Sequence, residues 1–138
     1  MKMYAQHPSA AGIIVYQDLG PDKLYFLGLI ALPEFQKRNH GIYDIPKGRI
    51  DPGETPLQCA IREAKEEATI DITHLDSGAY TYDRLTVWLA ESYQEPKIGV
   101  NPSSGLEEHL GYGWIKAEIM ELQCLDYLKP HIQWARKY

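Results

Sequence analysis

The sequence is poor in cysteine, and its two cysteines stand far apart. Cys59 and Cys124 belong to no CxxC or CxxH pattern, which excludes zinc sites and dithiol redox motifs of the usual spacing. We therefore expect two buried or half-exposed thiols in a reducing compartment, and we assign them no chemistry.

Long apolar runs are also missing. No run approaches the roughly 18 residues of a membrane span, and the N-terminus lacks the basic-then-apolar pattern of a signal peptide. We expect a cytoplasmic protein with no membrane partner. A length of 138 residues with 44% hydrophobic composition fits one domain over residues 1–138, with a real core.

Basic residues are not in excess. The chain has 14 Lys and Arg against 19 Asp and Glu, and a formal net charge of −5 at pH 7. This balance excludes broad, sequence-independent binding to a nucleic-acid backbone. A polyphosphate remains a candidate substrate if metal ions reverse the local sign of an acidic site. No oligomeric state is predicted.

What the sequence does contain is one dense motif. Residues Gly48 to Ile70 read GRIDPGETPLQCAIREAKEEATI, a Gly/Pro loop followed by a helical pattern. Thr55 precedes a proline and stands three residues before Gln58, which predicts a capping box at the helix start. At about 100° per residue, one apolar arc is expected to pack on a sheet. This arc contains Leu57, Ile61, Ala64 and Ala68.

Three acids, Glu63, Glu66 and Glu67, cluster on the opposite side of this helix and are expected to share one exposed face. Carboxylates this close raise each other's pKa unless a cation neutralises them. Oxygen ligands without His or Cys favour Mg²⁺, or Mn²⁺, over zinc. A glutamate-rich face can also be merely solvated, or paired at i,i+4 as Arg62 with Glu66 could be.

The complete spacing favours the metal site. Pro46-Lys47 precedes a G-x5-E-x7-R-E-x2-E-E pattern that a hydrophobic residue follows. The segment resembles the Nudix box of the Nudix hydrolases, which cleave a nucleoside diphosphate linked to another moiety with a divalent metal. Thr69 stands where the family usually has glycine. Because a β-branched residue resists the left-handed conformation that glycine adopts easily, we expect a changed helix end there.

Motifs outside the box resemble those of the asymmetrical diadenosine tetraphosphate hydrolases (bis(5′-nucleosyl)-tetraphosphatases). They are Ser9 to Tyr16, Ile45 to Gly48, Val87 to Glu91 and Glu107 to Trp114. Diphosphoinositol polyphosphate phosphohydrolases and RNA 5′-pyrophosphohydrolases share much of this framework. The scarcity of Lys and Arg clusters disfavours a highly phosphorylated inositol ring.

The resemblance implies residue roles. The implied metal ligands are the carboxylates of Glu63, Glu66 and Glu67 and the backbone carbonyl of Lys47. Glu67 or Glu63 would take the proton of a metal-bound water that attacks phosphorus, and the implied catalytic residues are Glu63, Glu67 and Arg62. Arg62 would hold the acidic face in order, Glu54 would act through water or through contacts to the ligands, and Gly48 would be structural.

A further ligand or base from outside the box is common in the family, and Glu108 in the Glu-His motif is the candidate. Glu107 is the second choice, and a plain surface pair in a mobile loop is the alternative. The predicted substrate contacts are His40, Tyr43, Lys47, Tyr82, Arg84 and Tyr112. Tyr82 and Tyr112 could stack on adenine, whereas Arg84, Lys47 and His40 could bind phosphates. A core or surface position is the alternative for each tyrosine, and a solvated position is the alternative for His40.

The predicted fold is α/β: a mixed sheet with the catalytic loop and helix on one face, the α/β/α sandwich that the Nudix resemblance implies. Strands are expected at Ala10–Tyr16 and Leu24–Ile30, which a turn separates, at Ile42–Pro46 and Ile70–Ile72, within Ala79–Tyr93, and at Gly111–Ile115. Loops are expected at Pro33–Gly41 and Ile98–Leu106, and helices at Lys116–Cys124 and Leu125–Lys137 with a break near Pro130.

The sequence thus predicts a metal-dependent hydrolase that cuts diadenosine tetraphosphate into ATP and AMP. The enzyme alternatives are an RNA 5′ end, a diphosphoinositol phosphate or a nucleoside triphosphate. A noncatalytic nucleotide sensor is the alternative from another class. The intact set of Glu54, Arg62, Glu63, Glu66 and Glu67 disfavours it.

Overall fold

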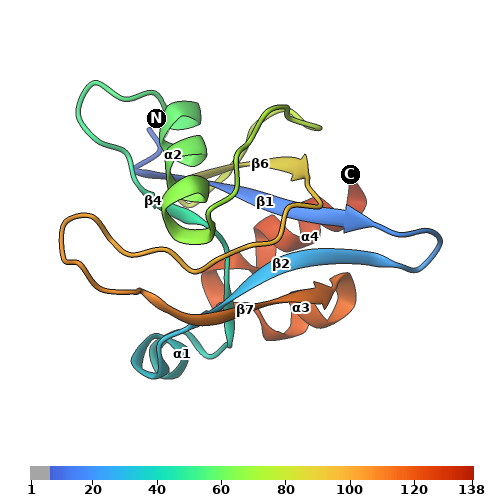
Figure 1. Ribbon diagram of the computed structural model, residues 1–138. Coiled ribbons are helices and arrows are strands. Elements are labelled where there is room, and N and C mark those ends of the chain that lie inside the picture. The colour runs from blue at the N-terminus through green and yellow to red at the C-terminus, as the bar shows by residue number, and fades with distance from the viewer. Residues whose placement is uncertain (1–6) are drawn as a thin grey trace, which may run out of the picture.

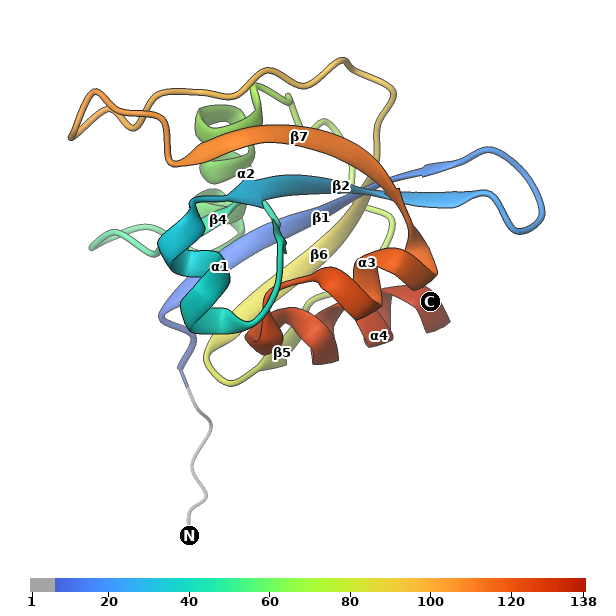
Figure 2. The same ribbon diagram turned by 90° about the horizontal axis from the view of Figure 1, so that it is seen from below.

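The computed structural model describes residues 7–138, and it shows a mixed sheet between two layers of helices (Figure 1), as predicted. Helix α2 covers one face of the sheet, and α3 and α4 cover the other (Figure 2). In chain order the elements are β1 (Ala10–Asp18), β2 (Leu24–Ala31), α1 (Pro33–Asn39), β3 (Tyr43–Asp44), β4 (Lys47–Arg49), α2 (Pro56–Ala68), β5 (Tyr80–Tyr82), β6 (Leu85–Glu91), β7 (His109–Lys116), α3 (Ala117–Gln123), η1 (Asp126–Leu128) and α4 (Lys129–Lys137).

Strand β1 is the centre of the sheet, whose order is β3-β2-β1-β6-β5. It pairs antiparallel with β2 and, at Ala10–Gly12, with β4, and it pairs in parallel with the whole of β6. Strand β7 pairs antiparallel with β2. The parallel pair brings the chain before α2 and the chain after it into one sheet.

Alternating side chains of β1 build two separate cores, as the two-residue period of a strand requires. Ala11, Ile13 and Val15 are fully buried on the α2 side, whereas Ile14 is buried against α3 and α4. Both faces are thus covered by helices, which explains the nearly continuous apolar run of this strand.

Helix α2 begins where the sequence predicts. Thr55 is the N-cap, its Oγ1 accepts from the backbone N–H of Gln58 at 3.1 Å, and Gln58 Oε1 accepts from the Thr55 N–H at 2.9 Å. The predicted apolar arc is partly wrong, because Ile61 is exposed. The buried residues are Cys59, Ala60, Glu63, Ala64 and Ala68. Small side chains on this face let the helix lie close to β1.

The predicted change at the end of α2 is also wrong. Thr69 is the C-cap and adopts the left-handed conformation itself, with φ 58° and ψ 38°. Its backbone N–H still donates to the last carbonyls of the helix, and its Oγ1 donates to the carbonyl of Lys97 at 2.8 Å. The chain therefore leaves the helix as a glycine would, and the hydroxyl gains a partner that glycine lacks.

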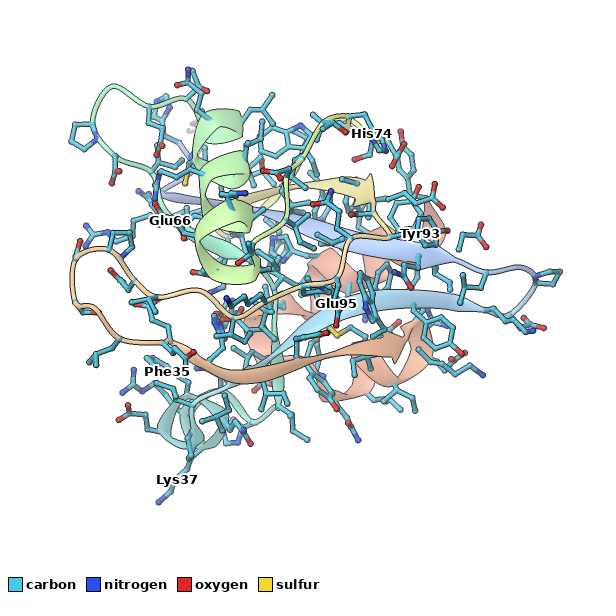
Figure 3. The ribbon with its side chains drawn as sticks, in the orientation of Figure 1. Phe35, Lys37, Glu66, His74, Tyr93 and Glu95 are labelled. Carbon is cyan, nitrogen blue, oxygen red and sulfur yellow. The ribbon has the colours of Figure 1, made fainter. Side chains whose placement is uncertain are left out.

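The predicted loop at Pro33–Gly41 is largely helix α1. Proline in the first turn, Glu34 near the start and two basic residues in the last turn suit a short helix. The sequence shows no apolar periodicity here because α1 buries no residue. Figure 3 shows the side chain of Lys37, in this helix, pointing away from the molecule.

Two further expectations fail. Residues 70–72 form no strand, because Ile70 is buried beneath the end of α2 instead of pairing with another strand. The C-terminal helices do not break at Pro130, which lies in the first turn of α4; the break lies after α3, at Cys124 and Leu125. The remaining predicted strands and the loop at 98–106 are confirmed. Over residues 7–138, no helix combines the length and apolar character needed to cross a bilayer.

Candidate active site

A cavity of about 560 Å³ opens between α2, β4 and the segment of residues 99–109. Polar and charged side chains line most of it. It brings together seven of the residues that the sequence predicts for the site: Lys47, Gly48, Arg62, Glu63, Glu66, Glu67 and Glu108. Glu107, the second choice outside the box, is exposed and does not line the cavity.

Glycine at position 48 leaves room for the carboxylate of Glu63. A Cβ at Gly48 would lie 2.0 Å from Oε2 of Glu63, which is far inside contact distance. Any other residue would push the carboxylate of Glu63 out of its position. The packed position of the Glu63 carboxylate therefore requires glycine at position 48.

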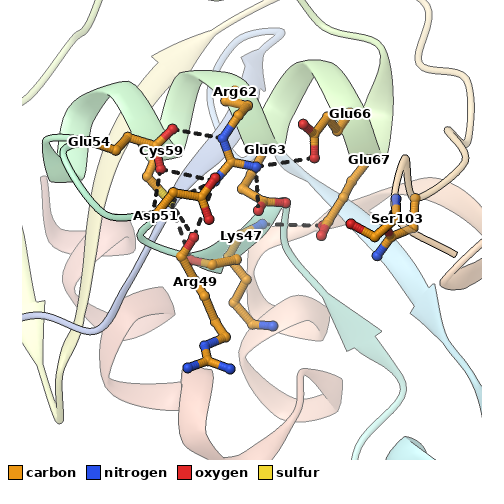
Figure 4. Close-up of polar contacts among 12 residues, drawn as sticks. Lys47, Arg49, Asp51, Glu54, Cys59, Arg62, Glu63, Glu66, Glu67 and Ser103 are labelled. Atoms are coloured by element: carbon orange, nitrogen blue, oxygen red, sulfur yellow. Dashed lines mark hydrogen bonds and ion pairs between the residues drawn. The ribbon is translucent and has the colours of Figure 1, made fainter.

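Arg62 organises the acidic face of α2 (Figure 4). Its Nε and Nη2 donate to the two carboxylate oxygens of Glu54 at 2.7 and 3.0 Å, and its Nη1 donates to Glu63 at 3.1 Å and to Glu66 at 3.2 Å. The hydrogen bonds from Arg62 lower the pKa of Glu54 to about 2. The same bond to Glu54 raises the pKa of Arg62, so the guanidinium is a permanent cation.

Glu63 and Glu67 form a carboxylate pair on the cavity side of α2. Glu63 is buried, with 8% of its surface exposed, so the expectation of one exposed acidic face is wrong for this residue. Glu67 Oε1 accepts from the backbone N–H of Lys47 at 3.2 Å. Burial raises the pKa of both carboxyl groups, and the charge of Asp44 adds to the effect on Glu67. The pair will hold a proton or a cation in preference to two bare charges.

A second polar network, which the sequence does not reveal, lies on the β3 side of the cavity. Asp44 accepts from Nζ of Lys47 at 3.2 and 3.3 Å, and its Oδ2 lies 3.1 Å from Nε2 of His109. Burial acts to raise the pKa of Asp44, but Lys47 and His109 outweigh it and lower that pKa. Likewise burial acts to lower the pKa of Lys47, and Asp44 reverses the effect, so the pKa is raised.

The ammonium of Lys47 also lies 5.3 Å from the ring centroid of Tyr127, within cation–π range. The i,i+3 spacing of Asp44 and Lys47 gave no signal for their ion pair, because this spacing brings side chains together on a helix and these residues lie in β3 and β4. Contact with His109 has no local signal, because 65 residues separate it from Asp44. Arg49, an exposed cation that lines the cavity, was also missed, although it lies inside the recognised motif.

The donors in the cavity suit a hard divalent cation. Carboxylate oxygens of Glu63, Glu66, Glu67 and Glu108 line it, and oxygen ligands are those that Mg²⁺ prefers. Within residues 7–138, no three His, Cys, Asp or Glu side chains are already grouped as a metal site. In this geometry Glu63 and Glu66 face Arg62, and Glu67 faces the Lys47 N–H, so these carboxylates would turn toward a bound cation.

The cavity does not include five of the predicted substrate contacts. Tyr82 packs edge-on to His131 of α4, on the opposite face of the sheet, and Arg84 lies in the turn between β5 and β6. His40 caps the end of α1. Tyr43 packs into the core beneath α3 and α4, and Tyr112 packs into the core beneath α2. Their roles as substrate contacts stay predictions without support from this geometry.

A model of the NUDIX domain matches residues 6–135. The chain belongs to the Nudix family. Members of the family generally use divalent metal ions, in agreement with the donor chemistry of the cavity.

Named relatives place the chain more narrowly within the Nudix family. A bis(5′-nucleosyl)-tetraphosphatase [asymmetrical] from Caenorhabditis elegans is 46% identical over 120 residues, 79% of each chain. A protein of the same name from Sus scrofa is 35% identical over 81 residues, 51% of this chain and 52% of that one.

Solved structures agree with the family assignment. A C. elegans Ap4A hydrolase in a binary complex superposes with a TM-score of 0.68 and 28% identity, covering 93% of this chain and 96% of that one. The NUDIX domain of Shewanella oneidensis NrtR, with ADP ribose, has a TM-score of 0.65 at 16% identity, covering 97% of this chain and 89% of that one. This second likeness concerns the fold alone.

Proposed function

We propose that this Nudix chain hydrolyses dinucleoside polyphosphates asymmetrically, and that it cuts diadenosine tetraphosphate into ATP and AMP with Mg²⁺ or Mn²⁺. The observation that carries the proposal is the 46% identity to the C. elegans asymmetrical tetraphosphatase over 79% of both chains. A cavity lined by the glutamates of the Nudix box supports it.

In this proposal Glu63, Glu66 and Glu67 hold the cation, together with the Lys47 carbonyl and Glu108. The bound ion would neutralise charge on the phosphoryl oxygens and make water more acidic. The Nη1 group of Arg62 donates to both Glu63 and Glu66 and so offsets the repulsion between their charges, and the bidentate contact of Arg62 links them to Glu54. Arg49, which is exposed and lines the cavity, supplies positive charge for the substrate phosphates, whereas the ammonium of Lys47 is already paired with Asp44.

We assign the role of general base to Glu67. Glu63 accepts from the guanidinium of Arg62, which weakens it as a base, whereas Glu67 accepts from the backbone N–H of Lys47 and lies beside the carboxyl group of Glu63. Burial raises the pKa of Glu67, so without a cation this carboxyl holds a proton. A bound cation would lower that pKa and leave the carboxylate free to accept a proton. Glu67 thus accepts the proton of the water that attacks phosphorus.

The test is product analysis by anion-exchange chromatography after incubation with diadenosine tetraphosphate and Mg²⁺. Parallel reactions contain 5′-triphosphorylated RNA, a diphosphoinositol phosphate, a panel of nucleoside triphosphates, and EDTA in place of Mg²⁺. ATP and AMP in equal amounts, absent with EDTA, are the expected result. Two ADP molecules would contradict the asymmetric cut.

If the protein turned over another of these substrates in preference to diadenosine tetraphosphate, that compound would be the better candidate for the substrate. Binding of nucleotides without turnover of any of them would identify the noncatalytic sensor instead. Because the assay reports products rather than phosphate release, a contaminating phosphatase is distinguished from the proposed cleavage.

A further inference from the structure

The segment that faces α2 across the cavity is fixed to the end of that helix. The N–H of Lys97 donates to the carbonyl of Ala68 at 2.9 Å, and the N–H of Gly99 donates to the carbonyl of Glu67 at 3.1 Å. A Cβ at Gly99 would lie 1.7 Å from the carbonyl oxygen of Glu66. The segment therefore starts in contact with the helical turn that carries two of the site glutamates, and it runs past the end of α2 in Figure 1.

Beyond this attachment, Asn101 closes the segment into a compact loop. Its N–H donates to the carbonyl of Leu106 at 2.8 Å, and its carbonyl accepts from the N–H of Gly105 at 2.7 Å. Its side-chain Oδ1 accepts from the N–H groups of Ser103 and Ser104 at 2.8 and 3.4 Å. The backbone and the side-chain oxygen of Asn101 are thus used to shape the loop.

The remaining group of this side chain, the amide N–H, serves a different purpose. Nδ2 of Asn101 donates to Oε2 of Glu108 at 2.5 Å, and both residues line the cavity. Glu108 is an exposed residue near the end of the loop, where a glutamate side chain otherwise samples many rotamers in water. The amide selects one orientation for the Glu108 side chain, at the cavity that Glu66 and Glu67 also line.

We propose that Asn101 is a positioning residue, which holds the carboxylate of Glu108 at the cavity so that it completes the set of oxygen ligands contributed by α2. The proposal rests on the proposed function in one respect, since it takes Glu108 to be a metal ligand. Carboxylate ligands are themselves usually hydrogen-bonded, and loss of such a partner typically weakens metal binding by about 10- to 100-fold.

The test uses Mn²⁺ as the probe and needs no nucleotide. Free Mn²⁺ is measured by electron paramagnetic resonance during titration of the wild type, Asn101→Ser, Glu108→Ala and the double variant. A serine hydroxyl can still accept the N–H groups of the turn, but it is too short to reach Glu108. Ser104→Ala is the matched control, because it removes another loop acceptor, the one for the Leu106 N–H, without touching Glu108.

The expected result is that Asn101→Ser and Glu108→Ala each raise the Mn²⁺ dissociation constant by about tenfold or more. The double variant should bind no more weakly than Glu108→Ala alone, and Ser104→Ala should bind as the wild type does. Unchanged binding by either single variant would overturn the proposal, as would a double variant in which the two losses multiply. An inactive wild type would refute the proposed substrate and leave this titration valid.

Discussion

The guanidinium of Arg62 holds Glu54 in a two-pronged contact, with Nε at 2.7 Å and Nη2 at 3.0 Å from the carboxylate oxygens. This contact ties the loop before α2 to the middle of the helix. A planar fork is needed for both bonds, so lysine cannot replace arginine here.

We expect Arg62→Lys to lower the free energy of unfolding by about 1.5–3 kcal/mol, the range for hydrogen bonds to charged groups. Chemical denaturation of the wild type and the variant measures this difference in the free energy of unfolding. Lys65→Ala is the control, because it breaks only the exposed ion pair with Asp71 and should cost less than about 1 kcal/mol. Equal losses in the two variants would mean that Arg62 does not organise the site.

The acid stability of the fold should depend on Glu54. Its folded-state pKa of about 2 lies below the ordinary value of 4.5. The unfolded chain therefore binds the proton more readily, and stability is fully present above pH 4.5 and is lost as the pH falls toward 2. Urea unfolding at pH 7, 4 and 3 should show a steeper decline for the wild type than for Glu54→Gln. If the stability of both proteins fell equally with pH, Glu54 would not be a source of the acid sensitivity.

Glu67→Gln should separate catalysis from folding. As the proposed base and ligand, Glu67 is expected to contribute about 10²- to 10⁴-fold to turnover. Burial of the Glu67 carboxyl beside Glu63 costs stability. The neutral glutamine of the variant should therefore leave the melting temperature unchanged or raise it. Product formation and circular dichroism melting are compared with Glu95→Gln, an exposed acid away from the cavity. Near-complete activity of Glu67→Gln would refute the mechanism.

Three substitutions at Thr69 dissect the left-handed helix end. Thr69→Val keeps the strained backbone but loses the hydrogen bond to Lys97, so we expect a loss of about 1 kcal/mol. Thr69→Ser keeps the hydroxyl and should be close to the wild type. Thr69→Gly relieves about 1–2 kcal/mol of left-handed strain while it loses the bond, so it should be more stable than the valine variant. Thermal unfolding of all three decides, and a valine variant as stable as the wild type would show that the hydroxyl contributes nothing.

Short-range signals carried most of what the sequence could predict. The start of α2 follows from Thr55 and Gln58 three residues apart, and the strands follow from apolar runs between turn residues. Helix α1 was missed because it buries nothing and so has no apolar period. The burial of Glu63 was missed because helical spacing assigns faces but does not reveal that β4 covers this one. Long-range partners such as His109 and Asp44 leave no local pattern.

The parallel pairing of β1 with β6 sets an order of events during synthesis. Residues Ala10–Tyr16 pair with Leu85–Glu91, so the central strand lacks its parallel partner until more than half of the chain has left the ribosome. Helix α2, with its glutamates, is synthesised before β6 can pair with β1 and complete the sheet on which the helix packs. Such distant pairing slows folding, and a nascent chain halted before Leu85 would expose one edge of β1 to the solvent.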